Sequence, residues 1–217
     1  MDFPTMVGML GEGFLVSLQI FALTLVGSLP LGMLVAFARM SRFKPLALLA
    51  RLYISIMRGT PLMLQMFAIY FAPYYVFGIS LTTDSKWYAT IVAFIVNYAA
   101  YFAEIYRSGI QSIPQGQHEA AEVLGYSKAQ TFVRIVLPQV IKRIMPAMTN
   151  EVITLVKDTS LAFSIGVIEM FTVAKQLVAA QVTMVPFAIA AAFYWAFNLL
   201  VDFVAGRIER KLSYYHD

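Results

Sequence analysis

The sequence predicts an all-α membrane protein with five transmembrane helices. Hydrophobic residues make up 60% of the 217-residue chain and charged residues only 13%, whereas a soluble domain has roughly 25% charged residues. The apolar residues gather in long runs, and the cations flank these runs instead of forming a basic stripe of the kind that binds nucleic acid. This length has room for a single membrane domain, residues 1–217. The lack of cysteine excludes disulfides and thiol chemistry.

Each predicted span is a run of about 20 mostly apolar residues, because a helix of that length crosses the hydrocarbon with its backbone polar groups satisfied internally. The first span, residues 14–38, carries no charge. The second span, residues 59–81, follows Arg58 and has Pro61 in its first turn, where a proline is tolerated.

The remaining spans follow the same rule with more polar content. The third, residues 87–106, opens with the pair Trp87-Tyr88, and such aromatic residues are typical of the membrane–water interface. The fourth, residues 146–167, is apolar apart from a small group of ionisable side chains. The fifth, residues 185–205, is the last apolar run in the chain.

The cations of the connecting segments predict the orientation, since cytoplasmic loops carry an excess of Lys and Arg. Lys86 and Lys175 are the only cations in the loops on one side. The N-terminus is therefore expected outside and the C-terminus in the cytoplasm. The cations on the opposite, cytoplasmic side are Arg39, Arg42, Lys44, Arg51 and Arg58, then Arg107, Lys128, Arg134, Lys142 and Arg143, and finally Arg207, Arg210 and Lys211.

One cytoplasmic segment, residues 119–138, carries the most specific pattern in the chain. It reads EAAEVLGYSKAQTFVRIVLP. The sequence Glu-Ala-Ala, a glycine four residues later and the ending Ile-x-Leu-Pro resemble the cytoplasmic "EAA loop" of permease subunits of bacterial ABC importers. In that family the segment forms two short coupling helices that dock into a cleft on the ATP-hydrolysing subunit.

The resemblance assigns roles to residues of this loop, which spans residues 114–138 between the third and fourth spans. Ala120 and Ala121 would form a small face that allows close approach of the ATPase. Glu119 would supply a charge at the contact, and Gly125 would make the turn between the two helices. A short motif needs a matching context, and the predicted position between two spans, on the cytoplasmic side, supplies it.

Three further segments resemble the polar amino acid branch of these permeases: residues 51–62 (RLYISIMRGTPL), 97–117 (NYAAYFAEIYRSGIQSIPQGQ) and 155–162 (LVKDTSLA). The resemblance implies the type I importer permease fold. It also implies a multi-pass subunit of the bacterial cytoplasmic (inner) membrane. Such a subunit translocates a polar amino acid, zwitterionic or cationic, into the cytoplasm by alternating access.

The resemblance also implies partners. They are two cytoplasmic ATP-binding subunits, a second copy of this permease or a sister permease, and an extracytoplasmic binding protein that delivers the amino acid. The chain has no G-x-x-x-x-G-K-[ST] phosphate loop and no Ser/His/Asp arrangement, and two histidines without cysteine make no usual zinc site. We therefore expect no cofactor in this chain and no enzymatic activity of its own, with ATP and Mg²⁺ bound by the partner ATPase.

Ionisable groups at membrane depth are expensive and default to a functional hypothesis. Glu151, Thr154 and Asp158 are spaced three and four residues apart and form a stripe on the fourth span. An amino acid's ammonium can be met by Asp158 or Glu151. Its carboxylate can be met by Lys157, by the hydroxyl of Thr159 or Ser160, or by backbone N–H groups if the helix breaks near Asp158. Candidates on the other spans are Asn97 and Glu104, which share a face of the third span with Tyr101 and Ser108, and Gln65 on the second span.

Other interpretations remain open at this point. Lys157 could pair with Glu104 or Glu151 on a neighbouring helix and serve packing only. Glu169 is expected in an outer loop, facing the binding protein or water. The whole chain could instead be an ion-coupled secondary amino acid transporter, which also uses intramembrane charges, or a membrane sensor or scaffold that borrows the fold.

Overall fold

Helices account for nearly all of residues 1–212, which are the residues that the computed structural model describes. The last residues of the predicted single domain, 213–217, lie outside the described residues. Three helices, α1 (Phe3–Arg39), α4 (Thr83–Gln111) and α9 (Val185–Leu212), are each long and apolar enough to cross a membrane. Two further pairs of helices pass the same test together but are bent, so the described part has up to five spans.

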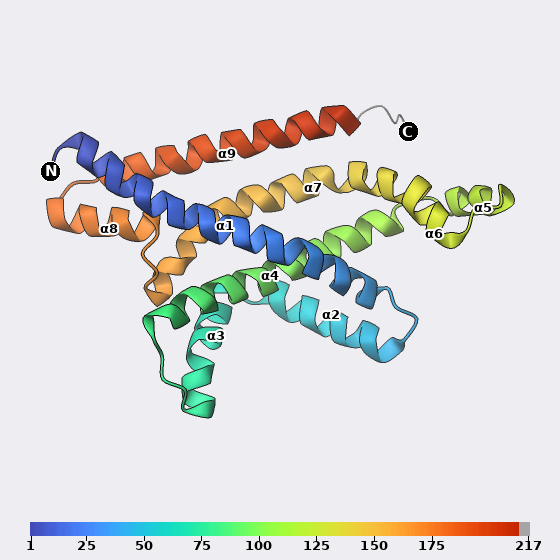
Figure 1. Ribbon diagram of the computed structural model, residues 1–217, viewed down its shortest axis with the longest axis horizontal. Coiled ribbons are helices and arrows are strands. Elements are labelled where there is room, and N and C mark those ends of the chain that lie inside the picture. Colours follow the sequence, from blue (N-terminus) through green and yellow to red (C-terminus); the bar gives the residue numbers. More distant parts are fainter. Residues whose placement is uncertain (213–217) are drawn as a thin grey trace.

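The centre of the bundle is the packing of α1 along α4 (Figure 1). Small residues let the two backbones approach closely, which is how helices associate in a membrane, where lipid removes the hydrophobic drive. A Cβ added to Gly32 would lie 2.9 Å from the Cβ of Phe102 and 3.0 Å from the carbonyl oxygen of Ala99. Both helices are longer than the sequence predicted, and α1 begins at Phe3 instead of residue 14.

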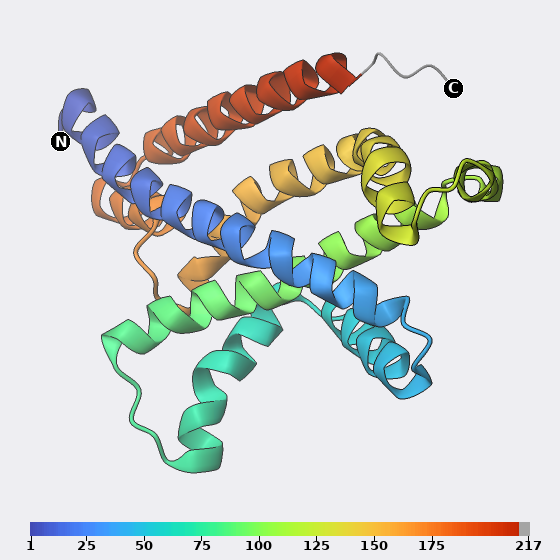
Figure 2. The ribbon, with the colours of Figure 1, turned by 45° about the vertical axis from the view of Figure 1, so that its right-hand side comes forward.

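The second predicted span, residues 59–81, contains a shorter helix, α3 (Leu62–Phe77). This helix meets the preceding α2 (Lys44–Gly59) at an angle of 110°, and the two form the two arms below α4 in Figure 2. Pro61 disfavours the helical conformation in the residue before it, and Thr60 is accordingly extended, with φ −125° and ψ 148°. The chain therefore turns a corner at the start of the predicted span, and its helix begins at Leu62 instead of residue 59.

The predicted coupling loop is a helical hairpin that runs directly into the fourth span. It contains α5 (Gln115–Val123) and α6 (Lys128–Thr131), and a π-helical turn, Phe132–Val136, joins α6 to α7 (Leu137–Asp158). The fourth span thus begins before residue 146, because Pro146 is accommodated inside α7 instead of starting it. The α-helix ends at Asp158 and tightens into a 3₁₀ helix, Thr159–Ile165.

The outer loop expected after residue 167 is also ordered differently. It forms α8 (Met170–Gln181), and Glu169 is its N-cap: the carboxylate accepts hydrogen bonds from the backbone N–H groups of Phe171 and Thr172, both at 2.8 Å. Glu169 is fully buried and also accepts a hydrogen bond from Ser17 of α1 at 3.4 Å. Its expected exposure to water or to another protein was therefore wrong, because the carboxylate satisfies the orphan N–H groups of a helix start.

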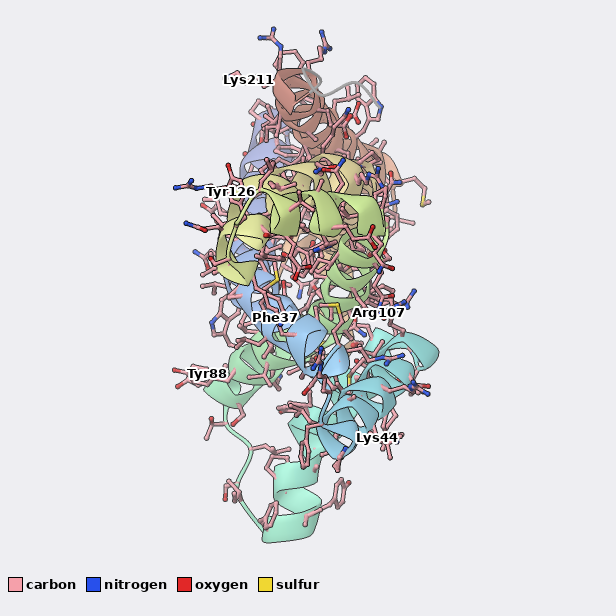
Figure 3. The ribbon with its side chains drawn as sticks, turned by 90° about the vertical axis from the view of Figure 1, so that its right-hand side faces the viewer. Phe37, Lys44, Tyr88, Arg107, Tyr126 and Lys211 are labelled. Carbon is pink, nitrogen blue, oxygen red and sulfur yellow. The ribbon has the colours of Figure 1, made fainter. Side chains whose placement is uncertain are left out.

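The basic ends of the helices gather at one end of the molecule. The C-terminal ends of α1, α4 and α9 and the N-terminal ends of α2 and α7 all lie at the end where α5 and α6 stand (Figure 1). Figure 3 looks onto this end and labels Lys44, Arg107 and Lys211. The charge asymmetry read along the chain is thus also an asymmetry in space.

Replacing Gly32 by alanine is expected to destabilise the chain by about 1–3 kcal/mol, the usual cost of overpacking, because the new Cβ meets the α4 backbone. Gly11→Ala in the same helix is the control. A Cβ there meets nothing within 4 Å, and alanine favours the helix by about 0.5–1 kcal/mol. Thermal unfolding of the purified variants measures both, and equal midpoints for the two would contradict the assigned packing.

Candidate functional site

A cavity of about 200 Å³ lies where the corner before α3 meets α4 and α7. The three elements come from distant parts of the sequence, and each contributes polar groups. The cavity is larger than the share of about 30 Å³ that one water molecule takes in the liquid. The residues that line it are Thr60, Pro61, Leu62, Asn97, Tyr98, Tyr101, Glu151, Thr154, Asp158 and Leu161.

The α7 wall of the cavity is acidic. Glu151 and Asp158 both line it and are half-buried. The hydroxyl of Tyr98, a residue only 2% exposed, donates a hydrogen bond of 2.7 Å to a carboxylate oxygen of Asp158. Thr154 also lines the cavity, and its hydroxyl donates to the carbonyl of Asn150 at 2.9 Å. Among the residues that the structure describes, the lining holds two carboxylates and no cation, so it suits a ligand that carries an ammonium group.

The opposite wall is the start of a helix. Thr60, Pro61 and Leu62 line the cavity, and α3 begins at Leu62. The first N–H groups of a helix have no partner within the helix, and the dipole gives that end a partial positive charge that favours an anion. The cavity therefore has an acidic side on α7 and an electropositive side at α3. Sequence reasoning considered a helix break near Asp158. The α-helix does end at Asp158 and continues as a 3₁₀ helix, whereas a new helix starts beside the cavity at Leu62.

A buried amide network holds this corner in place. The Gln65 amide nitrogen donates to the carbonyl of Met57 at 2.9 Å and to the carbonyl and hydroxyl of Thr60 at 3.1 and 2.8 Å. Asn97 donates to Met57 at 3.0 Å and to the Gln65 amide oxygen at 2.9 Å. Gln65 does not line the cavity, whereas Asn97 does. The amide donors of both predicted substrate ligands thus bond to the corner.

Other predicted ligands lie outside the cavity lining. Glu104 forms an ion pair with Arg107, one helical turn further along α4. Lys157 is exposed and does not line the cavity, because adjacent residues on a helix point about 100° apart and Asp158 takes the cavity side. Thr159 and Ser160 each donate their hydroxyl to the backbone carbonyl three residues earlier, at 2.8 Å. Of the candidates, the structure brings together Asn97, Glu151, Thr154 and Asp158.

Two aromatic residues of the site were not singled out as ligands from the sequence. Tyr98 follows Asn97 directly, and only the fold reveals that its hydroxyl meets Asp158. Tyr101 shares a helical face with Asn97, which was the available signal. The guanidinium carbon of Arg58 lies 5.3 Å from the centre of the Tyr101 ring, so a cation stands next to the cavity without lining it.

The α5–α6 hairpin, residues Gln115 to Thr131, projects from the end of the bundle (Figure 1). Its turn is made by Gly125, whose φ of 77° lies in the left-handed region that favours glycine. The N–H of Tyr126 donates to the carbonyl of Ala121 at 3.0 Å and that of Gly125 to Glu122 at 3.0 Å, which is a Schellman motif. The turn predicted at Gly125 is therefore present.

Exposure along α5 corrects one expected surface. Glu119 and Ala120 are exposed, but Ala121 is only 1% exposed and packs inside the hairpin, so it cannot itself contact a partner. Val123 and Leu124 instead reach into solvent at the end of α5, with 88% and 73% of their surface exposed. Sequence reasoning missed both because they belong to an apolar pattern that looks like an ordinary helix face.

The bent helical bundle, its acidic cavity and the projecting hairpin together define an integral membrane transport component. Residues 28–214 match the family described as binding-protein-dependent transport system inner membrane component, and the chain belongs to this family. The resemblance to importer permeases predicted from the sequence is thereby confirmed.

Particular relatives cover nearly the whole chain. The arginine transport system permease protein ArtQ of Bacillus subtilis is 36% identical over 203 residues, which are 93% of this chain and 91% of that protein. The L-cystine transport system permease protein TcyB of Bacillus subtilis is 35% identical over 208 residues, which are 95% of this chain and 87% of that protein. A solved structure of an amino acid ABC transporter with histidines matches with a TM-score of 0.86 and 32% identity, over 97% of this chain and 99% of that one.

Gln65→Leu is expected to lower the free energy of unfolding by about 1–3 kcal/mol, because the carbonyl of Thr60 loses its Gln65 donor and the amide of Asn97 loses an acceptor. Thermal unfolding of the purified protein checks this, with exposed Gln176→Leu on α8 as the control. An unchanged midpoint, together with a weakened response to substrate, would return Gln65 to the role of ligand.

Proposed function

We propose that this chain is the permease subunit of an ATP-driven importer that carries a polar amino acid across the bacterial inner membrane by alternating access. One observation carries the proposal. A single helical path leads from the exposed hairpin through the π-helical turn into α7, and α7 ends in the acidic wall of the cavity. A displacement of the hairpin would therefore move α7, and with it the cavity wall, without an intervening flexible loop.

The cavity supports an amino acid as the substrate. Asp158 and Glu151 would receive the α-ammonium, and the start of α3 would face the α-carboxylate, as broken helices do in other transporters. This pairing replaces the expected carboxylate partners Lys157, Thr159 and Ser160, which lie elsewhere. The names of the two relatives include arginine and cystine. Arginine is cationic and cystine is zwitterionic, and an acidic cavity accommodates either class.

The hairpin supports docking of a separate ATPase. Exposed apolar side chains outside the membrane mark interaction surfaces, and Val123 and Leu124 stand at its tip beside the exposed Glu119 and Ala120. Two cytoplasmic ATP-binding subunits would dock at the hairpins of the importer. These subunits, and not the permease, would bind ATP and Mg²⁺. A second permease copy or a sister permease and an extracytoplasmic binding protein would complete the importer, and the family description, which names binding-protein dependence, supports the latter.

The cycle follows from differential binding. ATP would favour the closed arrangement of its two subunits, which shifts the hairpins and turns the cavity outward, and hydrolysis would return it inward. A ligand moves such an equilibrium only by its different affinity for the two states. The N-terminus would lie outside and the C-terminus in the cytoplasm, in keeping with the cations gathered at the hairpin end.

Uptake into proteoliposomes that contain the complete assembly tests the proposal against the ion-coupled alternative. The proposal expects uptake that needs ATP on the hairpin side and persists without an ion gradient. Uptake that follows an imposed ion gradient and ignores ATP would overturn it. ATPase stimulation without any movement of amino acid would instead indicate a sensor.

Glu119→Lys is expected to lower uptake by at least about tenfold, since a reversed charge at an interface costs several kcal/mol against about 1.4 kcal/mol for each factor of ten. The chain should fold normally, because Glu119 is exposed. The measurement is uptake together with the amount of ATPase that co-purifies. Asp84→Lys, in the first turn of α4 far from the hairpin, serves as the control, and normal uptake by the Glu119 variant would remove the docking role.

Asp158→Asn is expected to reduce substrate-stimulated ATPase activity by about tenfold or more, because a hydrogen bond to a charged group contributes about 1.5–3 kcal/mol. Basal ATPase activity should persist. Asp202→Asn on α9, an exposed acid, is the matched control. If substrate stimulation is the same in both variants, Asp158 serves only to anchor Tyr98.

A further inference from the structure

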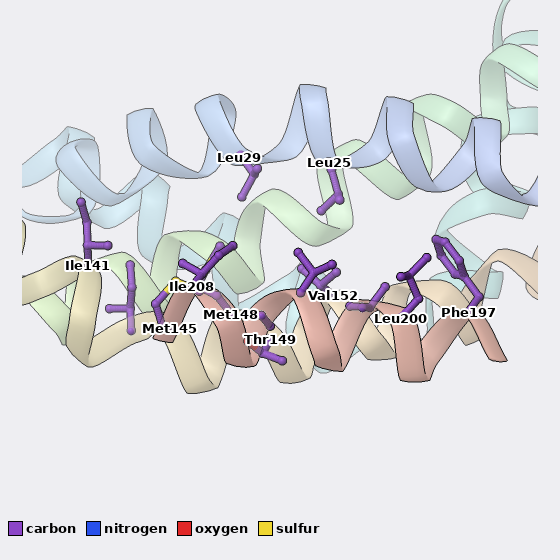
Figure 4. Close-up of a pocket in the computed structure, with 14 residues that line it drawn as sticks. Leu25, Leu29, Ile141, Met145, Met148, Thr149, Val152, Phe197, Leu200 and Ile208 are labelled. Atoms are coloured by element: carbon purple, nitrogen blue, oxygen red, sulfur yellow. The ribbon is translucent and has the colours of Figure 1, made fainter. Parts of the chain in front are cut away.

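A second and larger cavity lies outside the proposed transport site. It is a groove of about 460 Å³ between α1, α7 and α9. In Figure 4, Leu25 and Leu29 of α1 point into it from one side, and side chains of α7 and α9, including Met148 and Leu200, line the other. Its lining is apolar except for Thr149.

The length of the groove matches one leaflet of a membrane. Its lining positions on α7 run from Ile141 to Val152, and at about 1.5 Å per residue this distance is about 16 Å. The hydrocarbon core of a bilayer is about 30 Å thick, so the groove covers about half of it. A chain of methylene groups that entered from one surface would reach its far end near the bilayer centre.

The groove suits a single extended hydrocarbon chain. Such a chain is thinner than an α-helix, which is about 10 Å across with its side chains, and it would make apolar contacts along all three walls.

Cations stand at one end of the groove. Ile141 of α7 and Ile208 of α9 line that end (Figure 4), and they adjoin Lys142 and Arg207 in the sequence. The guanidinium carbon of Arg207 lies 4.7 Å from the centre of the ring of Phe203, an exposed residue of α9 outside the groove lining. Basic residues at this depth attract anionic lipid head groups.

We propose that the groove binds one acyl chain of an anionic phospholipid of the phosphatidylglycerol type, whose phosphate lies against Lys142 and Arg207. The lipid would fill the space between α7 and α9 that protein side chains leave open. The site is separate from the amino acid cavity, although Val152 in the groove adjoins Glu151 in the cavity on α7. The proposal does not depend on which substrate is carried.

Native mass spectrometry tests the acyl-chain site. The sample is the full-length chain in whatever complex is extracted with it from the membrane. The sample is delipidated in detergent and titrated with dioleoylphosphatidylglycerol. Val201→Trp, which places an indole in the groove, is expected to remove the bound lipid. Leu199→Trp, on a part of α9 that is 49% exposed and does not line the groove, should retain it. Equal lipid retention by the two variants would overturn the proposal.

A charge variant tests the head-group contact without altering the apolar walls. Arg207→Gln is expected to weaken retention of phosphatidylglycerol about five-fold, the factor that corresponds to about 1 kcal/mol for one cation near a lipid surface. Retention of dioleoylphosphatidylcholine should not change. Lys44→Gln on α2 is the control cation. A loss that is the same for both lipids would contradict a phosphate contact.

A second copy of the chain is the competing occupant, and the lack of native cysteine makes it easy to detect. Leu200→Cys places a thiol in the groove wall. The lipid proposal expects no disulfide between two copies after mild oxidation in the membrane. A disulfide-linked dimer would assign the groove to an interface between subunits and overturn the proposal.

Discussion

The carbonyl groups of Met57 and Thr60 impose the constraint on which the acidic cavity depends. Pro61 breaks the helix at this point, and inside a membrane such freed carbonyls need a partner within the protein. Gln65 and Asn97 supply it with donor–acceptor distances of 2.9–3.1 Å. The 110° corner between α2 and α3 is thereby stable, and it presents a helix start instead of a helix side to the cavity.

The rest of the bundle holds that corner against the acidic wall of the cavity on α7. Close packing of α1 on α4 places Tyr98 where its hydroxyl reaches Asp158 of α7, so α4 contributes to the corner through Asn97 and to the acidic wall through Tyr98. Because α7 continues from the hairpin, the same element belongs to the cavity and to the exposed end of the molecule. The buried carboxylate of Glu169 ties α8 to α1 at the other end.

How far the sequence could predict the site depended on whether its residues act within one helix or between helices. Glu151, Thr154 and Asp158 were predictable as a group, because a spacing of three and four residues on one helix puts side chains on one face. Gln65 and Glu104 were assigned to the substrate, yet Gln65 bonds to the corner and Glu104 to Arg107. A polar residue in a span needs a partner, but its sequence does not say whether that partner is the substrate or another part of the chain.

The sequence alone determined the membrane class, the helical fold, the family and the glycine turn of the hairpin, because these follow from local composition, a contiguous motif and the steric freedom of a single residue. Only the tertiary structure decided that Ala121 is buried while Val123 and Leu124 are exposed, that Glu169 caps a helix, and that α3 starts beside the cavity at Leu62. The physical reason is that exposure and hydrogen-bond partners depend on which helices pack together. That packing is set by contacts between residues far apart in the chain, such as those of Asn97 with Met57 and of Tyr98 with Asp158.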